Sequence, residues 1–397
     1  MNAEPETFDV VVIGGGPSGA TAATDLARRG FSVLLLDRAG RIKPCGGAIP
    51  PRLIRDFEIP DHLLVAQITS ARIVSPKDRH VDMPIGGFVG MVDREMFDEW
   101  LRERAGQAGA VRRKGDFERI DRAADGTAMV RYREKVSDDD LRSVRARAVL
   151  GADGANSSVG RQEIPAAKRT PFVFAYHEIV RSPRANSDEF NATRCDVYYR
   201  GELSPDFYGW VFPHGDTTSI GTGSAYKGFS LRQAVGALRK TAGLSNSETV
   251  RREGAPIPLR PASRWDNGKD VLLAGDAAGV VAPASGEGIY YAMASGRLAA
   301  DALEEFLLTG DARALKTARK RFMKAHGQVF RMLGMMQHFW YSNDNRRERF
   351  VHICRDVDVQ QLTWDAYMNK ELVRARPLAH IRIFFKNLAH LTGIASA

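Results

Sequence analysis

The residues between Phe8 and Asp37 constrain the fold of this chain more than any other stretch. An apolar run at 8–13 is followed by a glycine-rich turn, a segment at 17–29 with Ala and Leu at helical spacing, and a second apolar run at 31–36. A strand, a tight turn, a helix and a strand in this order predict a parallel βαβ unit. We therefore expect an α/β fold with a doubly wound parallel sheet.

The turn has the G-x-G-x-x-G spacing, with Gly14, Gly16 and Gly19. The first glycine permits the tight turn, the second lets a pyrophosphate approach the backbone, and the third lets the helix pack on the strand. Asp37 follows about 20 residues later, where a carboxylate accepts from a ribose 2′-hydroxyl and repels a 2′-phosphate. A glycine-rich structural turn is the alternative, but this context favours a dinucleotide, FAD or NAD rather than NADP.

Two more stretches place an acidic residue after a buried strand. Residues 146–150 lead into Gly-Ala-Asp153-Gly, and residues 271–274 lead into Gly-Asp276. Carboxyl ends of strands are where doubly wound folds bind ligands, and Asp276 can accept a hydrogen bond from a polyol hydroxyl. Gly286 and Gly288 then open a long helix, whose N–H groups can face a developing negative charge.

Two residues near these motifs have open interpretations. Arg94 stands at the start of a helix predicted within 91–108, where a cation is unfavourable, so it either makes a surface pair or reaches an anionic cofactor group. Cys45 lies beside Gly46–Gly47 in a segment predicted to be mostly loop. It is either close to the cofactor or a small buried thiol.

The region 171–257 is rich in predicted strands, with one helix near 230–242. Within it, the strand period of two puts Tyr208, Trp210 and Phe212 on one face. Such a face is either sheet core or the wall of a substrate pocket.

Composition narrows the class of protein. A chain of 397 residues suggests two or three domains, and 44% hydrophobic with 26% charged residues is ordinary for a globular protein. The three cysteines are far apart and the nine histidines form no metal-binding pattern, so we expect no metal site and a reducing compartment. We see no targeting segment at the N-terminus and no apolar run of 18 residues, and therefore expect a cytoplasmic protein.

The net charge of +9 is compatible with nucleic acid, an anionic membrane or an anionic substrate as partner. No nucleic-acid-binding motif is present in the sequence, so we expect no nucleic acid. The tail from Leu372 mixes basic and apolar residues, and is either a membrane-surface segment or a packed terminal helix pair.

The three acidic and glycine-rich motifs, in this order, resemble the two-domain FAD-dependent oxidoreductases of the aromatic-hydroxylase-like superfamily. The resemblance implies an α+β two-domain flavoprotein, with a Rossmann-like FAD domain of three-layer ββα character, an antiparallel-sheet substrate domain and a C-terminal helical region. The FAD domain is expected to comprise residues 1–70, 92–165 and 262–310. The substrate domain is expected to comprise residues 71–91 and 166–261, and the C-terminal helical region residues 311–397. The residues that the resemblance or the motifs assign to FAD are Gly14, Gly16, Gly19, Asp37, Arg94, Asp153, Asp276, Gly286 and Gly288.

A narrower resemblance is to the geranylgeranyl reductase family. Residues 205–213 fit its substrate-side pattern P-x-x-Y-x-W-x-F-P, and KPCGGAIPPRL around Cys45 resembles its cysteine-bearing loop near the flavin. Residues 356–377 resemble the branch of chlorophyll and bacteriochlorophyll biosynthesis. The absence of a transit peptide favours a bacterium, with the protein in the cytoplasm or peripheral at the inner, photosynthetic membrane.

This resemblance implies a reaction. Three of the four C=C bonds of a geranylgeranyl group would be saturated to give phytyl, on a free diphosphate or on the esterified pigment. Hydride would come from reduced flavin, and the electrons from NADPH or a ferredoxin. Cys45, Tyr208 or an ordered water would supply the proton, and Tyr208, Trp210 and Phe212 would line an isoprenoid tunnel.

Two other functions fit the same motifs. One is a flavoprotein monooxygenase of the superfamily, which would activate oxygen at an aromatic substrate. The other is a prenyl-binding carrier without redox chemistry, against which the intact glycine turn and Asp276 argue.

Overall fold

The computed structural model describes residues 5–38, 42–134, 141–165 and 170–370. They form two compact units. The first comprises residues 1–43, 94–172 and 256–330, and the second comprises residues 44–93, 173–255 and 331–397.

The first unit contains a sheet whose central strands are parallel. Its order is β6-β2-β1-β9, and β15 also pairs with β9. These strands are β1 (Thr7–Ile13), β2 (Val33–Asp37), β6 (Val111–Lys114), β9 (Leu141–Gly151) and β15 (Val271–Leu273). Val10, Val11 and Val12 of β1 are fully buried, so the first strand is the centre of the core. The predicted α/β fold is confirmed.

Two antiparallel strands, β7 (Asp116–Arg122) and β8 (Ala128–Arg133), extend the same sheet from β9. Short helix α4 (Ser158–Glu163) follows β9.

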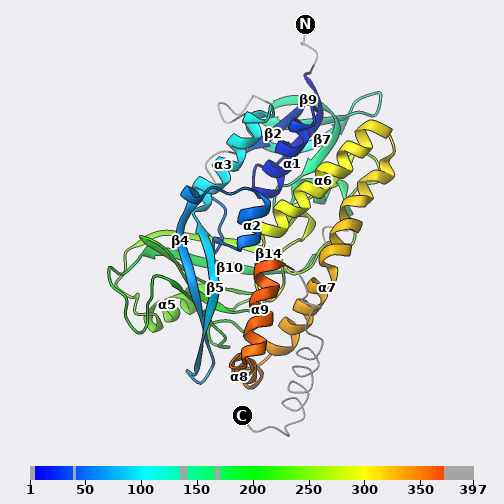
Figure 1. Ribbon diagram of the computed structural model, residues 1–397. Coiled ribbons are helices and arrows are strands. Elements are labelled where there is room, and N and C mark those ends of the chain that lie inside the picture. Colours follow the sequence, from blue (N-terminus) through cyan, green and yellow to red (C-terminus); the bar gives the residue numbers. More distant parts are fainter. Residues whose placement is uncertain (1–4, 39–41, 135–140, 166–169, 371–397) are drawn as a thin grey trace. The chain divides into compact units, whose positions relative to one another are not determined.

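Three helices of the first unit pack together: α1 (Pro17–Arg28) contacts α3 (Arg94–Gln107) and α6 (Ile289–Thr309) (Figure 1). The α1–α6 contact is close because Gly296 of α6 has no side chain, and a Cβ there would collide with the carbonyl oxygen of Ser18. Short helices η3 (Gly275–Ala278) and η4 (Ala312–Leu315) flank α6, and α7 (Lys316–Trp340) begins in this unit and ends in the second.

The second unit is built on an eight-stranded sheet of order β14-β10-β13-β12-β11-β4-β5-β3, in which β11 and β4 are parallel. Its strands are β3 (Ala48–Ile49), β4 (Leu64–Val74), β5 (His80–Val92), β10 (Phe172–Arg181), β11 (Arg194–Tyr198), β12 (Gly209–His214), β13 (Thr217–Ser224) and β14 (Thr249–Pro258).

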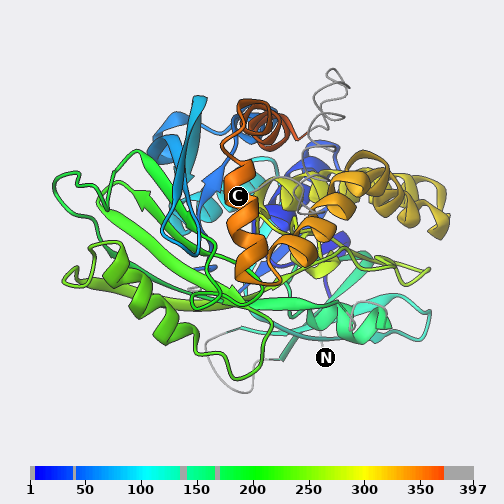
Figure 2. The ribbon, with the colours of Figure 1, turned by 90° about the horizontal axis from the view of Figure 1, so that it is seen from below.

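Each face of this sheet has its own apolar cluster. Val211 and Ile220 pack with Val235 and Leu238 of α5 (Leu231–Thr241), the helix predicted near 230–242, which Ser230 caps. Figure 2 shows α5 along one side of the sheet. On the other face, Met91, Cys195 and Phe212 pack with Trp364, Tyr367 and Met368 of α9 (Val357–Asn369).

The structure differs from the sequence expectation in two respects. Residues 44–70, which the sequence expectation assigned to the FAD domain, pack in the second unit because β4 pairs with β5 and β11. The helices predicted as a separate C-terminal region divide between the two units. The segment predicted as mostly loop, residues 38–60, contains helix α2 (Pro51–Asp56), and the short helix η1 (Asp61–Leu63) follows it. The mostly-loop prediction was wrong for α2, since proline at the first helical position starts a helix as well as a turn.

Up to residue 370, where the described part of the chain ends, helices α8 (Asp344–Ile353) and α9 follow α7. None of the helices in the described part of the chain has the length and apolar character needed to cross a membrane. The basic tail from Leu372 lies outside the described residues.

Candidate functional site

The glycine-rich turn between β1 and α1 has the geometry of a phosphate cradle. Gly14 has φ of +104°, and a Cβ at Gly19 would collide with the carbonyl oxygen of Gly14. A Cβ at Gly16 would instead meet no atom within 4 Å, so the backbone beside it is open. The residue after Gly16 begins the 12-residue helix α1, whose first N–H groups suit an anion. These residues therefore fit the pyrophosphate of a dinucleotide.

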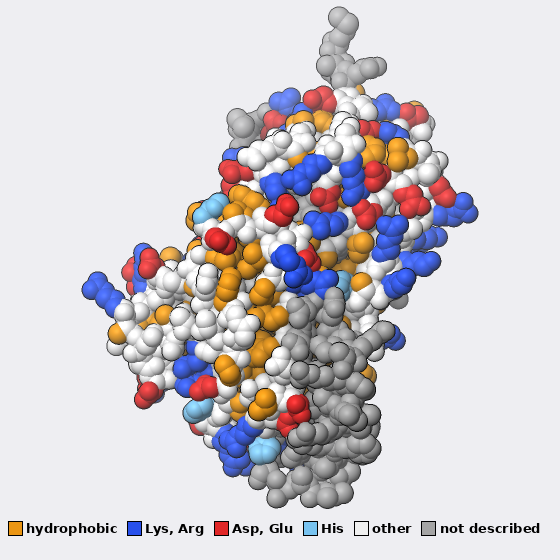
Figure 3. All heavy atoms as spheres, in the orientation of Figure 1, with side chains coloured by type: hydrophobic (Ala, Val, Ile, Leu, Met, Phe, Trp, Pro, Cys, Tyr) orange, Lys and Arg blue, Asp and Glu red, His pale blue; other side chains and the backbone are white. Residues whose placement is uncertain are grey.

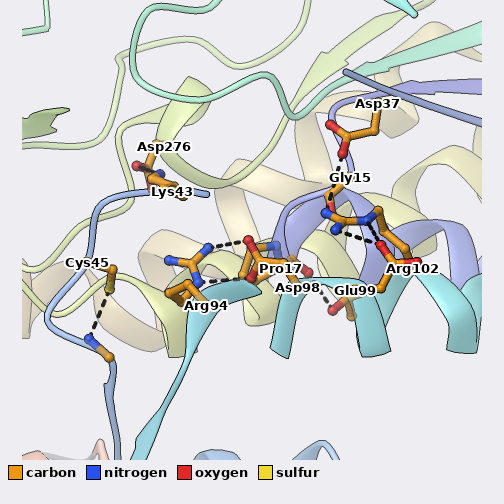
Figure 4. Close-up of polar contacts among 12 residues, drawn as sticks. Gly15, Pro17, Asp37, Lys43, Cys45, Arg94, Asp98, Glu99, Arg102 and Asp276 are labelled. Atoms are coloured by element: carbon orange, nitrogen blue, oxygen red, sulfur yellow. Dashed lines mark hydrogen bonds and ion pairs between the residues drawn. The ribbon is translucent and has the colours of Figure 1, made fainter. Parts of the chain in front are cut away.

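Asp37 stands at the end of β2 beside this turn and is held by Arg102 of α3 (Figure 4). Arg102 Nη1 lies 3.3 Å from Asp37 Oδ2 and 3.4 Å from the carbonyl oxygen of Gly15. Burial raises the pKa of the Asp37 carboxyl, although the Gly15 backbone and Arg102 favour its charged form. The carboxyl group is thus positioned to accept a hydrogen bond from a ribose.

Gly15 and Arg102 were missed in the sequence. A Cβ on Gly15 would lie 2.8 Å from Cδ of Arg102 and 2.9 Å from Cβ of Asp37, so glycine is needed here too. The spacing of Arg94, Asp98 and Arg102 at four-residue intervals was a usable signal, because it places all three on one face of α3.

Arg94 is buried and pairs with Asp98 on its own helix. Its Nε and Nη2 donate to the two carboxylate oxygens at 2.9 and 2.7 Å. The pair predicted from the sequence therefore exists but is not on the surface, and Asp98 offsets the cost of a cation in the first turn of α3. A contact between Arg94 and a cofactor stays a prediction.

Asp153 caps helix α4. Its carboxylate accepts from Ser157 Oγ at 2.5 Å and from the backbone N–H groups of Ser158 and Val159 at 2.6 and 3.2 Å. Burial raises the pKa of Asp153 despite these hydrogen bonds. Its geometry is that of a structural carboxylate that fixes the loop after β9, and direct cofactor binding stays a prediction.

Asp276 lies in η3, and its largely buried carboxylate forms an ion pair with Lys43 (Figure 4). Lys43 was not singled out in the sequence. Further along, Gly286 has φ of +66° and Gly288 caps the 21-residue helix α6. The Gly286 N–H donates to the carbonyl oxygen of Ala282 and the Tyr290 N–H to Glu287 Oε1, both at 3.0 Å, so a role of this helix start toward an anion stays a prediction.

In the second unit, the loop around Cys45 lies against β12. A Cβ on Gly46 would be 3.1 Å from the ring of Phe212, and one on Gly47 would collide with His214. The Gly47 N–H points to Cys45 Sγ at 3.4 Å. The structure therefore brings Cys45 and the aromatic strand together, although 160 or more residues separate them in the sequence.

Tyr208, Trp210 and Phe212 share a face, as predicted: the Tyr208–Trp210 and Trp210–Phe212 ring centroids are 6.1 and 6.3 Å apart. Tyr208 and Trp210 are buried and Phe212 is partly exposed. Burial raises the pKa of Tyr208 above its ordinary value, with smaller contributions from Tyr199 and Cys45. The buried aromatic surroundings therefore favour the neutral, protonated form of Tyr208.

The three cysteines are free thiols in different surroundings. Cys45 is partly exposed, whereas Cys195 and Cys354 are buried. Burial raises the pKa of Cys354 to about 12 and raises that of Cys195 as well. Of these thiols, Cys45 has the access that chemistry requires.

Helix α8 supplies a residue that sequence reasoning missed. Arg346, Arg347 and Arg349 form a basic run in the sequence, but Arg347 is buried and its Nη2 donates to the carbonyl oxygens of Ser204 at 3.2 Å and Pro205 at 2.5 Å. The same guanidinium donates to the Tyr341 carbonyl and to Asp344. It thus anchors the segment that leads into Tyr208.

Comparisons with known proteins agree with this picture. A family model described as lycopene cyclase protein matches residues 9–375. A geranylgeranyl diphosphate reductase of Rhodobacter capsulatus is 60% identical over 98% of both chains. The chloroplastic geranylgeranyl diphosphate reductase of Oryza sativa subsp. japonica is 34% identical over 96% of this chain and 86% of the relative.

Solved structures show the fold. A geranylgeranyl bacteriochlorophyll reductase-like protein from Thermoplasma acidophilum matches with a TM-score of 0.80 at 22% identity, covering 94% of this chain and 99% of that chain. The flavin-dependent brominase Bmp2 matches with a TM-score of 0.73 at 16% identity, covering 96% and 99%.

Proposed function

Because this chain belongs to the geranylgeranyl reductase family, we propose that it is a flavin-dependent oxidoreductase that saturates C=C bonds of a geranylgeranyl group. The observation that carries the proposal is the 60% identity to the Rhodobacter capsulatus reductase over 98% of both chains. At that level the fold and the chemistry of a site are retained together. We further propose that three of the four C=C bonds are reduced, which gives phytyl for chlorophyll or bacteriochlorophyll.

FAD is the proposed cofactor. The open backbone at Gly16 and the start of α1 would hold its pyrophosphate, and Asp37, steadied by Arg102, would hold the adenosine ribose. Asp276, at the start of η3, would bind the ribityl chain, and the start of α6 at Gly288 would face the flavin ring. Reduced FAD, when bound, supplies a hydride to the alkene.

The aromatic face of β12 would hold the prenyl chain. Tyr208, Trp210 and Phe212 offer adjoining rings, and each CH₂ of substrate buried there contributes roughly 0.8 kcal/mol of binding. Such a surface excludes water and holds an isoprenoid without fixing it at a single position, which successive reductions require.

The second carbon of each double bond needs a proton, and we propose Cys45 as its donor. Tyr208 is the less suitable group, because burial raises its pKa and its ionised form would lie among aromatic rings. Cys45 is partly exposed, so water can restore its proton between turnovers. Replacing Cys45 by Ser is expected to lower kcat by about 100-fold or more, within the range for loss of general acid catalysis. A Tyr208→Phe variant is expected to be affected less.

We propose NADPH as the electron donor and the esterified pigment as the substrate, with ferredoxin and free geranylgeranyl diphosphate as the alternatives. The test incubates the purified flavin-loaded protein with each donor and each substrate, without oxygen, and identifies the products by mass. Stepwise gain of two, four and six hydrogens supports the proposal. Oxygen uptake with a hydroxylated product would indicate a monooxygenase instead, and purified protein without flavin absorbance would indicate a carrier.

Peripheral attachment to an anionic membrane is also proposed. Lys316, Lys320 and Lys324 are exposed and follow one another at four-residue spacing on α7. Figure 3 shows Lys and Arg side chains along the edge where Figure 1 places this helix. Such a row suits anionic headgroups, each lysine contributing about 1 kcal/mol near the surface. Replacing all three by Gln is expected to reduce sedimentation with anionic vesicles, and equal binding by the variant would contradict this role.

A further inference from the structure

The indole of Trp210 lies over Gly221 of the neighbouring strand β13. A Cβ added to Gly221 would lie 2.6 Å from Cε2 of Trp210 and even closer to Cζ2, so the ring occupies the space that a side chain would fill. Trp210 and Gly221 are directly paired across the two strands. The position of the indole therefore depends on glycine at 221.

The edge of the same indole is tied to a buried chain of polar groups. Trp210 Nε1 lies 3.1 Å from Ser219 Oγ, which lies 2.9 Å from His177 Nδ1. His177 Nε2 lies 3.0 Å from Glu253 Oε2, and Arg251 Nε lies 2.5 Å from the other carboxylate oxygen of Glu253. Ser219 is fully buried and His177 is 3% exposed.

The chain has a defined direction. An indole nitrogen only donates, so Ser219 Oγ accepts from Trp210, and in the neutral His177 tautomer with its proton on Nε2 the Ser219 hydroxyl donates to Nδ1. His177 then carries its remaining proton on Nε2 and donates it to Glu253. Each member has one role, and removal of Ser219 leaves the indole N–H and the imidazole without their partners in the chain.

We propose that Ser219, His177 and Glu253 are positioning residues that fix the plane of the Trp210 indole, and that this plane determines how many double bonds of the prenyl chain are reduced. The specificity role rests on the proposed function. The geometry that carries it is the combination of the close contact between the ring and Gly221 and the hydrogen bond at the ring edge. Together they fix the tilt of a ring that burial against the sheet alone would leave variable.

The expected consequence concerns product distribution. A prenyl chain must move along the aromatic face by one isoprene unit between reductions. An indole held in one plane presents the same surface to each isoprene unit that reaches it, whereas a tilted indole obstructs further movement of the prenyl chain. Loss of the chain should therefore leave the first reduction nearly unchanged and make singly and doubly reduced products accumulate.

The experiment is a double-mutant cycle between Ser219→Ala and Trp210→Phe in the full-length flavin-loaded protein. Ser219→Ala should lower the ratio of triply to singly reduced product by about fivefold, and should have almost no further effect when Trp210 is already Phe. Glu253→Met, which keeps the length of the side chain but removes the acceptor of the His177 Nε2 proton, should act in the same direction if Ser219→Ala folds poorly. Gly221→Ala should give the same partial products by lifting the ring.

The matched control is Thr218→Val. Thr218 is fully buried on β13, one residue from Ser219 and therefore on the opposite face, and its hydroxyl bonds with Ser182 at 2.8 Å. It loses a buried hydroxyl as Ser219→Ala does, but should leave the product ratio unchanged. A second readout is independent of activity: hydrogen exchange of the Trp210 indole N–H, followed by NMR, should accelerate about tenfold or more in Ser219→Ala and not in the control.

The outcomes separate the two ideas. Additive effects in the cycle, or an indole exchange rate unchanged by Ser219→Ala, would overturn the positioning role while prenyl reduction by the wild-type protein upholds the proposed function. A wild-type protein that reduces no geranylgeranyl substrate with either electron donor would overturn the proposed function and the specificity role with it.

Discussion

The glycine turn of the first unit and the aromatic strand of the second are assembled in different ways. Gly14, Gly16 and Gly19 act through the backbone and lie within six residues of one another. The surroundings of Trp210 and Phe212 come from distant segments, including the Cys45 loop, His177 on β10 and Arg347 on α8. The first region is thus specified locally, and the second depends on the packing of the whole unit.

The difference has a consequence for mutations. In the glycine turn, the effect of a substitution follows from the space around one Cα atom. At the aromatic strand, it depends on partners more than a hundred residues away. Variants that break one contact in each region test this distinction.

The largest effect is expected for Gly19→Ala. Its methyl group would overlap the carbonyl oxygen of Gly14, and neither backbone can yield without separating α1 from β1. We expect a loss of more than about 4 kcal/mol in the free energy of unfolding, seen as a low soluble yield and a much lower Tm by circular dichroism.

Gly236→Ala is the control for this variant. Gly236 lies in α5, where an added Cβ meets no atom within 4 Å, so alanine should stabilise the helix by about 0.5–1 kcal/mol. If Gly19→Ala melted like the control, the turn would be more adaptable than the local argument requires.

The second effect concerns Arg347, which anchors the segment leading into the aromatic strand of the second unit. Arg347→Gln removes a buried guanidinium that donates to the carbonyl oxygens of Ser204 and Pro205 and pairs with Asp344. We expect a loss of about 3–5 kcal/mol by urea unfolding, as for one partner of a buried charged network. Arg313→Gln should leave the urea midpoint almost unchanged, since the Arg313 side chain is 85% exposed in its pair with Asp311. Equal losses in both variants would contradict the anchoring role.

How far the sequence predicts each region follows from the same distinction. The strand, turn, helix and strand at 7–37 were predictable because each residue acts on its neighbours. The shared face of Tyr208, Trp210 and Phe212 was predictable from strand periodicity. The partners of that face were not, because a basic run gives no sign that Arg347 rather than Arg346 is buried. For Arg94, the sequence indicated an ion pair but not its burial.

The third effect isolates ligand binding in the glycine turn. Gly16→Ala adds a methyl group to open space, with φ of −73° that alanine readily adopts, so folding should change by no more than about 1 kcal/mol. The same methyl would occupy the space proposed for the pyrophosphate. FAD affinity, measured by flavin fluorescence on apoprotein, should fall about 10- to 100-fold, which corresponds to about 1.4–2.8 kcal/mol. An unchanged Kd with normal folding would contradict the proposed cradle.

The smallest effect appears only at high pH and concerns a tyrosine in the sheet of the second unit. Burial raises the pKa of Tyr198, on β11, from 10.0 to about 12. Below pH 10 both the folded and unfolded states keep the proton, so Tyr198→Phe should show no pH-dependent difference from wild type. As pH rises from 10 towards 12, the unfolded state loses its proton first, and the wild-type protein loses up to about 2.7 kcal/mol of stability. Since the variant has no hydroxyl, urea unfolding at pH 9 and pH 11 should show its stability rising relative to wild type, by about 1.4 kcal/mol at pH 11. Cys354 is present in both proteins, so its titration does not contribute to the difference in their stabilities. A difference in stability that is the same at pH 9 and pH 11 would show that the packed second unit does not hold Tyr198 neutral.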